Sequence, residues 1–261
     1  MKKDVVIGMS GGVDSSVAAA LLVQQGYSVT GVTMNIWDGT SMAEFEGRHA
    51  CFGPDEAEDA ARAAEVCRTL GIPFHQFDLQ REYRDIVLTD FSDEYRQGRT
   101  PNPCIRCNSR VKFGALVEKV REAGISFDLF ATGHYARTSF DEALGQTVLL
   151  RAADLRKDQS YFLYRLTPGQ LETTLFPLGA LDKERVKQLA GELGLGYEDV
   201  RESQDFICGD YTDLLDFAMV PGNIVDTNGT ILGRHQGYAR YTIGQRRGLG
   251  IAADKPLYVI G

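Results

Sequence analysis

Short apolar runs alternate with longer segments of helical spacing along the first half of the chain. The runs predict strands, and the segments between them, with their glycine and proline boundaries, predict helices. We expect strands at 4–8, 27–34, 72–79 and 127–132, and helices at 15–25, 55–70 and 108–123, the last with Asn108 as its N-cap. Strands that alternate with helices are typical of a parallel sheet covered on both faces.

The pattern changes near Gly209. We expect one more helix at 210–220, and then short β-prone runs, including 239–243 and 257–260, separated by turn signals such as Asn228-Gly229. Tyr135–Arg151 reads as a hairpin inserted in the first part. We therefore predict an α/β domain over residues 1–210 and a small β-rich domain over residues 211–261.

Composition narrows the class of protein. With 43% hydrophobic and 25% charged residues, the chain is an ordinary globular protein, which excludes wholesale disorder. No apolar run approaches the roughly 20 residues of a membrane span, and the apolar stretch near Met1 is too short for the core of a signal peptide. We expect a cytoplasmic protein without a membrane partner.

The basic residues are unevenly distributed. The net charge is −8, yet segments 96–112 and 234–247 hold nine of the 28 basic residues and no acidic residue. Two cationic segments on an acidic body can guide an anionic polymer to one face. Short windows without acids also arise by chance, so the charge pattern alone leaves both interpretations open.

A glycine-containing loop follows the first predicted strand. Ser10-Gly11-Gly12-Val13-Asp14-Ser15-Ser16 lies between a strand and a helix, where backbone N–H groups and the helix N-terminus can face phosphates. The three serines add hydroxyl donors. The loop lacks the lysine of a Walker motif. Asp14 beside a phosphate would be repulsive unless a cation lies between them, which predicts Mg²⁺.

The cysteines point to sulfur or metal chemistry. Cys104 and Cys107 form a CxxC pair, and Cys107 precedes the predicted helix beside two arginines, so we expect its pKa to be depressed to about 3.5–7.5. A zinc site on Cys104, Cys107 and Cys208 is the alternative, with His134 or His235 as the fourth ligand. Cys67 fits a helix core, and Cys51 has no assignment.

Several strings resemble one family. The SGGVDSS loop is similar to that of the pyrophosphate-motif ATPases, which cleave ATP to AMP and pyrophosphate. The later strings closely resemble the tRNA 2-thiouridylases over essentially the whole chain: they are TPNPCIRCN from Thr100, ATGHYAR from Ala131, KDQSYFL from Lys157, SQDFIC from Ser203 and YTIGQRRGLG from Tyr241. The family normally continues into a further C-terminal β-barrel, which this sequence lacks.

The resemblance implies roles for particular residues. It implies ATP contacts from Gly8, Met9, Ser10, Gly11, Gly12, Val13, Asp14, Ser15, Met34 and Gly133. It places Asn102, Pro103 and Cys104 against the target base, and His134, Lys157, Asp158 and Gln159 against tRNA. Cys107 matches the nucleophile, and Cys208 matches a carrier of persulfide sulfur received from a donor protein. The implied partner is the anticodon region of tRNA.

The resemblance leaves the sulfur chemistry open. In one scheme Cys208 carries a persulfide and a Cys107–Cys208 disulfide forms. In the other, Cys104, Cys107 and Cys208 bind an iron–sulfur cluster; some family members have Asp at the position of Cys104, which does not decide between the schemes. Two rival functions also stay open: an ATP-dependent synthetase that adenylates a small molecule, and a non-catalytic tRNA-binding fragment.

Overall fold

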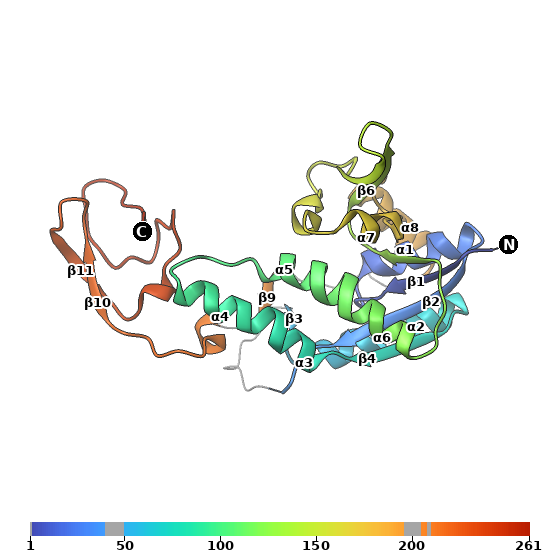
Figure 1. The fold of residues 1–261 in the computed structure, drawn as a ribbon, viewed down its shortest axis with the longest axis horizontal. Helices are drawn as coiled ribbons and strands as arrows, with labels where there is room; N and C mark the ends of the chain where they lie inside the picture. The colour runs from blue at the N-terminus through green and yellow to red at the C-terminus, as the bar shows by residue number, and fades with distance from the viewer. Residues whose placement is uncertain (1, 40–49, 196–204, 208–209) are drawn as a thin grey trace.

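A five-stranded parallel sheet lies at the centre of the first part of the molecule (Figure 1). The computed structural model describes residues 2–39, 50–195, 205–207 and 210–261. The strand order is β4 (Phe74–Asp78), β2 (Ser28–Asn35), β1 (Asp4–Gly8), β5 (Leu129–Thr132) and β8 (Thr174–Leu175). The pairs are all parallel, which confirms the predicted fold class. The carboxyl ends of β1, β2 and β5 therefore share one edge.

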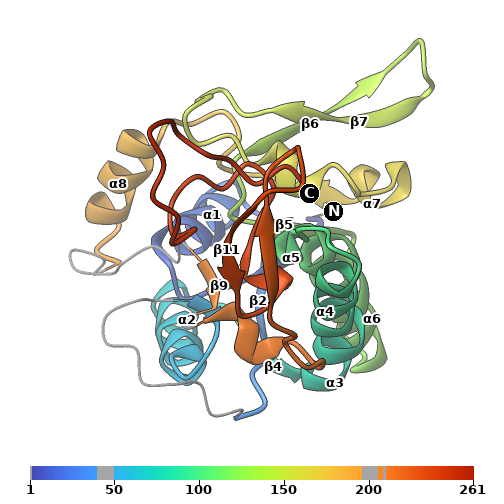
Figure 2. The ribbon, with the colours of Figure 1, turned by 90° about the vertical axis from the view of Figure 1, so that its left-hand side faces the viewer.

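Helices cover both faces of this sheet, as Figure 2 shows. One face carries α1 (Val13–Gln24), α2 (Glu56–Leu70) and α8 (Lys183–Glu192), whose apolar residues share a core with β1 and β2. The other face carries α3 (Gln80–Tyr83) and α6 (Leu116–Glu122), with α7 (Pro168–Glu172) nearby. α4 (Thr89–Arg96) and α5 (Pro103–Arg106) lie on the same side of the molecule (Figure 2). Burial of both faces explains why the strands read as apolar runs.

One predicted helix begins earlier than expected. Helical structure runs from Pro103 through a π-helical stretch, Cys107–Ala115, into α6. Its N-cap is Asn102, whose side chain accepts a hydrogen bond from the Cys104 N–H at 3.1 Å, so the prediction of Asn108 as N-cap is wrong. Proline fits the first helical position because its missing N–H has no intrahelical partner there.

Smaller strands lie outside the central sheet. β6 (Ala136–Asp141) and β7 (Gln146–Arg151) form the predicted hairpin, and β3 (Ala50–Phe52) pairs in parallel with β9 (Asp205–Ile207). β10 (Gly222–Val225) and β11 (Ile231–His235) form a hairpin whose turn contains Gly229 with φ of +81°.

Three predictions for the C-terminal part are wrong. Residues 210–220 contain only one short 3-10 helix, Tyr211–Leu214, and residues 238–240 form another where a strand was expected. Instead of a strand at 257–260, Val259 makes isolated backbone hydrogen bonds with Gly244 and Gln245. Residues of the first two segments, among them Tyr211 and Ala239, pack with Phe91 and Tyr95 of α4, so tertiary contacts override their local propensity.

Aromatic contacts join the C-terminal part to α4. The rings of Tyr95 and Tyr211 stack with centroids 5.0 Å apart, and the Tyr238 hydroxyl donates to the Arg96 carbonyl at 2.8 Å. Arg96 also forms an ion pair with Asp216 at 2.6 Å. The predicted division after residue 210 stays a prediction. In the described part of the chain, no helix is long and apolar enough to cross a membrane; cytoplasmic localisation stays a prediction.

Candidate active site

The glycine loop lies at the carboxyl end of β1 and leads directly into α1, as predicted. Gly11 has φ of +71°, and a Cβ there would collide with the backbone carbonyl of Asp59 in α2. Gly12 is the N-cap of α1. Glycine at position 11 is therefore required both by the backbone conformation and by the close approach of α2.

Two of the three serines make hydrogen bonds within the loop itself, and their contact with phosphate stays a prediction. The hydroxyls of Ser15 and Ser16 donate to the Gly12 carbonyl at 3.1 and 3.0 Å, and both residues are buried. The Ser10 N–H in turn donates to the Ser15 hydroxyl at 3.2 Å. These two hydroxyls hold the shape of the loop, and Ser10 is the exposed serine of the three.

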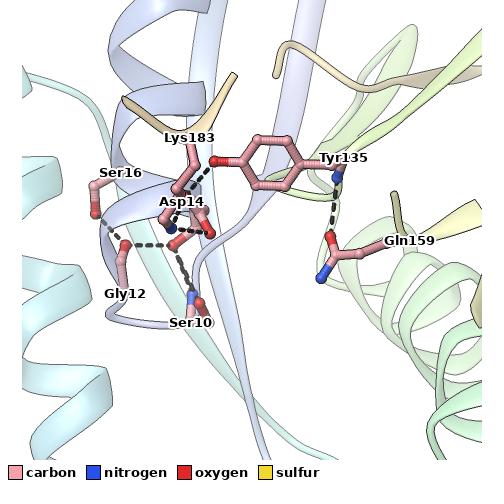
Figure 3. Close-up of polar contacts among 8 residues, drawn as sticks. Ser10, Gly12, Asp14, Ser16, Tyr135, Gln159 and Lys183 are labelled. Atoms are coloured by element: carbon pink, nitrogen blue, oxygen red, sulfur yellow. Dashed lines mark hydrogen bonds and ion pairs between the residues drawn. The ribbon is translucent and has the colours of Figure 1, made fainter. Parts of the chain in front are cut away.

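Two residues from distant parts of the chain donate hydrogen bonds to the Asp14 carboxylate (Figure 3). Lys183 Nζ donates to both carboxylate oxygens, at 2.7 and 2.9 Å, and the Tyr135 hydroxyl donates to Oδ1 at 2.8 Å. The Lys183 ammonium also lies over the Tyr135 ring, 5.8 Å from its centroid. The sequence-based case for a cation assumed an uncompensated carboxylate, whereas the structure supplies Lys183 at this position.

Neither Lys183 nor Tyr135 was found from the sequence. Lys183 is the first residue of α8 and is only 7% exposed. A lysine in the first turn of a helix opposes the helix dipole and is costly when buried. This unfavourable position of Lys183 was the feature of the sequence that could have indicated a buried partner. Only the fold shows that the partner is Asp14, 169 residues earlier in the sequence.

The other residues expected at the nucleotide gather at the same edge of the sheet. Gly8 ends β1, and Gly133 follows β5, which pairs with β1. A Cβ on Gly133 would lie 2.7 Å from the Ser15 nitrogen, so the end of β5 packs directly on the loop. Met34 lies near the end of β2, and Met9 is buried. Their contact with a nucleotide stays a prediction.

Segment 157–159, which is expected to contact tRNA, is hydrogen-bonded to Tyr135, and the Tyr135 hydroxyl contacts Asp14 of the glycine loop. Gln159 Oε1 accepts from the Tyr135 N–H, and the Gln159 N–H donates to the Tyr135 carbonyl, both at 2.9 Å. Asp158 accepts from the Ala152 N–H and the Ser160 hydroxyl, both at 2.8 Å. Burial opposes ionisation of Asp158, but these hydrogen bonds outweigh it and lower its pKa. Lys157 is partly exposed.

His134 is neutral. Burial, with a further contribution from the charge of Lys112, lowers its pKa well below the usual value. Nδ1 makes a 2.8 Å hydrogen bond with the Thr132 hydroxyl, and the ring lies among Phe113 and Phe176. A contact of His134 with RNA would therefore be a hydrogen bond or a stacking contact and not an ion pair with phosphate.

The predicted low pKa of Cys107 is wrong. Burial raises the pKa of this thiol to about 12, which outweighs the nearby positive charge of Lys112. Because the helix begins at Pro103, Cys107 lies in the second turn, beyond the first turn in which the dipole acts. The neighbouring Arg106 is ion-paired with Asp90. Cys104, not Cys107, occupies the first turn.

Cys51 belongs to the same neighbourhood. The thiols of Cys51 and Cys104 both lie close enough to Cys107 for their charges to act on its pKa. Cys51 lies on β3, beside β9, which ends one residue before Cys208. Cys208 itself lies outside the described residues, so its predicted convergence with the other two stays a prediction. Among the described residues, no group of three or more ligands is arranged to hold a metal.

The two cationic segments are partly compensated in space. Arg96, Arg99 and Arg106 pair with acids from α4 and the C-terminal part, and Arg240 pairs with Asp210. In the part of the chain that the structure describes, the basic residues of these segments without an ion-pair partner are Arg110, Lys112, Arg234, Arg246 and Arg247. The absence of acidic residues within segments 96–112 and 234–247 therefore overstated their local positive charge, because acidic residues from other segments lie beside them in space.

A parallel α/β sheet with a glycine loop and a helix N-terminus at its carboxyl edge defines an adenine-nucleotide-binding domain of the HUP class. The family model described as "tRNA methyl transferase HUP domain" matches residues 3–209, and "tRNA methyl transferase PRC-barrel domain" matches residues 213–261. The chain is 52% identical over 259 residues to the tRNA-specific 2-thiouridylase MnmA of Endomicrobium trichonymphae, covering 98% of this chain and 72% of that protein. It is 48% identical to the protein of the same name from Geotalea uraniireducens, covering 100% of this chain and 70% of that one. The chain belongs to the family of tRNA-specific 2-thiouridylases.

Among solved structures, a 4-thiouridine synthetase in complex with RNA and ATP is similar over 75% of this chain and 42% of its own, with a TM-score of 0.48 and 18% identity.

Proposed function

We propose that this protein uses ATP to replace the C2 oxygen of a uridine in tRNA with sulfur, giving 2-thiouridine, AMP and pyrophosphate. One observation carries the proposal: a phosphate-binding loop and a cysteine-bearing helix occur together in a chain about half identical to named 2-thiouridylases over almost its whole length. The wobble position of the anticodon is the proposed target because an unpaired base is extruded at modest cost.

The first step activates the uridine. Its C2 oxygen attacks the α-phosphorus of ATP, the bond to the β-phosphate breaks, and pyrophosphate leaves. The N–H groups of the loop and the N-terminus of α1 stabilise the pyrophosphate charge. Lys183 supplies the positive charge that a Walker lysine supplies elsewhere, and Asp14 and Tyr135 hold it in place.

The described residues do not fit a magnesium ion held by the protein alone. Both oxygens of Asp14 already accept from Lys183, and no further carboxylate completes a ligand set in the described part of the chain. Mg²⁺ usually keeps its waters and binds largely through substrate phosphates. We propose that it enters as part of the substrate, MgATP.

The second step transfers sulfur. In the preferred scheme, a persulfide-carrying donor protein loads Cys208, and the terminal sulfur attacks C2 of the adenylated base while AMP leaves with the former C2 oxygen. The Cys107 thiolate then attacks Cys208 Sγ, which releases 2-thiouridine and leaves a disulfide that a thiol reductant opens. Because the Cys107 pKa is about 12 in the free protein, binding of RNA or nucleotide must favour its thiolate.

The iron–sulfur alternative makes a different prediction for Cys104. Cluster ligation needs all three thiolates, so Cys104→Ala abolishes activity in that scheme and only slows it in the persulfide scheme. The described residues provide two of the three thiols on one helix and no complete ligand set. A brown protein with about four irons per chain after anaerobic purification would establish the cluster.

The test is a reconstituted reaction. The protein is incubated with MgATP, a persulfide-charged donor protein, a thiol reductant and unmodified tRNA, and the nucleosides are analysed by mass spectrometry. The proposal predicts 2-thiouridine with wild type and none with Cys107→Ala. AMP formation that needs no RNA would instead favour a small-molecule synthetase, and tRNA binding without AMP formation would favour a non-catalytic fragment.

A further inference from the structure

Two large aromatic rings are exposed side by side just after the segment 157–159. Tyr161 and Tyr164 are 62% and 58% exposed, and their ring centroids lie 6.1 Å apart with an interplanar angle of 37°. Leu163 between them is buried, and Phe162 is partly buried. The short 3-10 helix Ser160–Leu163, with Tyr164 as its C-cap, therefore directs Leu163 inward and leaves the two phenol rings exposed to solvent.

These rings stand beside the cysteine-bearing helix. The Asn108 side-chain amide donates to the Phe162 carbonyl at 3.2 Å, and the 3-10 helix packs on α5, which carries Cys104. In the other direction along the chain, Gln159 holds the backbone of Tyr135, whose hydroxyl contacts Asp14. The pair thus lies next to the proposed sulfur site and is linked to the nucleotide loop.

The surroundings are rich in arginine. Arg106 lies within charge range of the Tyr164 hydroxyl, and Arg99, Arg106 and Arg165 all act on the carboxylate of Glu94. Arg110 and Arg165 are exposed and form no ion pair with any residue that the structure describes. Aromatic rings framed by arginines suit a polyanion whose uncharged parts present flat faces, which describes single-stranded nucleic acid.

We infer that Tyr161 and Tyr164 are a stacking platform for the unpaired anticodon-loop bases that flank the target uridine. This inference rests on the proposed function, since the occupant is its RNA substrate. Clamping one base between two rings needs about 7–8 Å between ring planes. At 6.1 Å and a tilt of 37° the two rings are too close for a sandwich. Each ring therefore stacks on one base through its outer face. The platform in this way holds the anticodon loop of the RNA open while the target uridine enters the site.

The test measures binding of an unmodified tRNA anticodon stem–loop to the full chain. Tyr161→Ala and Tyr164→Ala should each weaken binding about tenfold, since stacking on an aromatic ring has this order of effect. Tyr161→Phe and Tyr164→Phe should bind like wild type because the ring face remains. Phe140→Ala is the matched control: this ring is 57% exposed on β6, in the hairpin away from α5.

Two further readouts separate stacking from other roles. The salt dependence of binding should be unchanged in both alanine variants, because the lost contact carries no charge. A 2-aminopurine placed beside the target uridine should be quenched on binding to wild type and less so on binding to the alanine variants. Unchanged melting temperatures check that these exposed substitutions leave the fold intact.

The outcomes distinguish the platform from the proposed function. If wild type binds the stem–loop and both alanine variants bind it equally well, the platform is wrong and the rings serve another partner, such as a protein. The platform is also wrong if the phenylalanine variants lose as much affinity as the alanine variants. If wild type does not bind RNA, both the platform and the proposed function fail.

Discussion

At the scale of single residues, the site depends on compensation between groups far apart in the sequence. Asp14 is a carboxylate in an anion-binding loop, which is unfavourable until Lys183 neutralises it and Tyr135 hydrogen-bonds to it. The same ammonium is then fixed at the loop, where pyrophosphate charge develops in the proposed first step.

Replacing Lys183 tests this role. Lys183→Met should lower the rate of AMP formation by roughly 10²–10³-fold, the usual cost of removing one preorganised donor from a developing anion. Lys187→Met, an exposed lysine on the same helix, is the matched control and should leave the rate unchanged. Steady-state AMP release measures both, and equal rates in the two variants would show that Lys183 serves only the fold.

The raised pKa of Cys107 predicts its reactivity. Only the thiolate is alkylated, so with a pKa of about 12 the rate of labelling should rise about tenfold per pH unit from pH 7 to 10 without a plateau. Cys51 is exposed and should be labelled before Cys107 at pH 8. Peptide mapping after iodoacetamide treatment measures both rates. A Cys107 rate that is already constant above pH 8 would restore the low pKa that the sequence predicted.

At the scale of elements, local sequence signals predicted the sheet well. Apolar runs bounded by glycine located β1, β2 and β5, because these strands are buried on both faces and need no long-range information to be recognised. The start of the cysteine helix was missed because the Pro-Asn-Pro stretch reads as a loop. Asn102 followed by Pro103 is nevertheless a strong helix start.

The close packing of β5 on the loop makes Gly133 a test at this scale. Gly133→Ala would place a Cβ 2.7 Å from the Ser15 nitrogen, so we expect both a loss of stability of about 1–3 kcal/mol and a loss of nucleotide binding. Gly191→Ala in α8 meets no atom within 4 Å and should stabilise the protein by about 0.5–1 kcal/mol.

Urea unfolding and ATP titration of both variants measure these effects. Normal ATP affinity in Gly133→Ala would mean that the loop relaxes away from β5 without consequence for the nucleotide.

At the scale of the whole molecule, tertiary contacts decide what the sequence could not. The aromatic cluster of Phe91, Tyr95, Phe206 and Tyr211 draws residues after 210 onto α4, so segments with β propensity adopt 3-10 or irregular structure. The Asp14–Lys183 pair depends on the separate packing of α1 against α8, and the Arg96–Asp216 pair depends on the packing of the C-terminal part on α4. No local pattern contains that information.

The uncompensated arginines of the C-terminal part should contribute to RNA binding. Arg246 and Arg247 are exposed and have no ion-pair partner among the described residues. Replacing both with alanine should flatten the log–log salt dependence of tRNA affinity by about 1–2 units, whereas ATP affinity should not change. Arg68→Ala on α2, where the arginine is paired with Glu65, is the control. An unchanged slope in the double variant would place these arginines outside the RNA interface.

The central claim is that the C2 oxygen of uridine is adenylated before sulfur replaces it. An anticodon stem–loop whose target uridine carries ¹⁸O at C2 tests this claim directly, because the leaving AMP must take that oxygen with it. After reaction with MgATP and the persulfide-charged donor protein, mass spectrometry should find one ¹⁸O in AMP for every 2-thiouridine formed. AMP without ¹⁸O, alongside 2-thiouridine, would contradict the account.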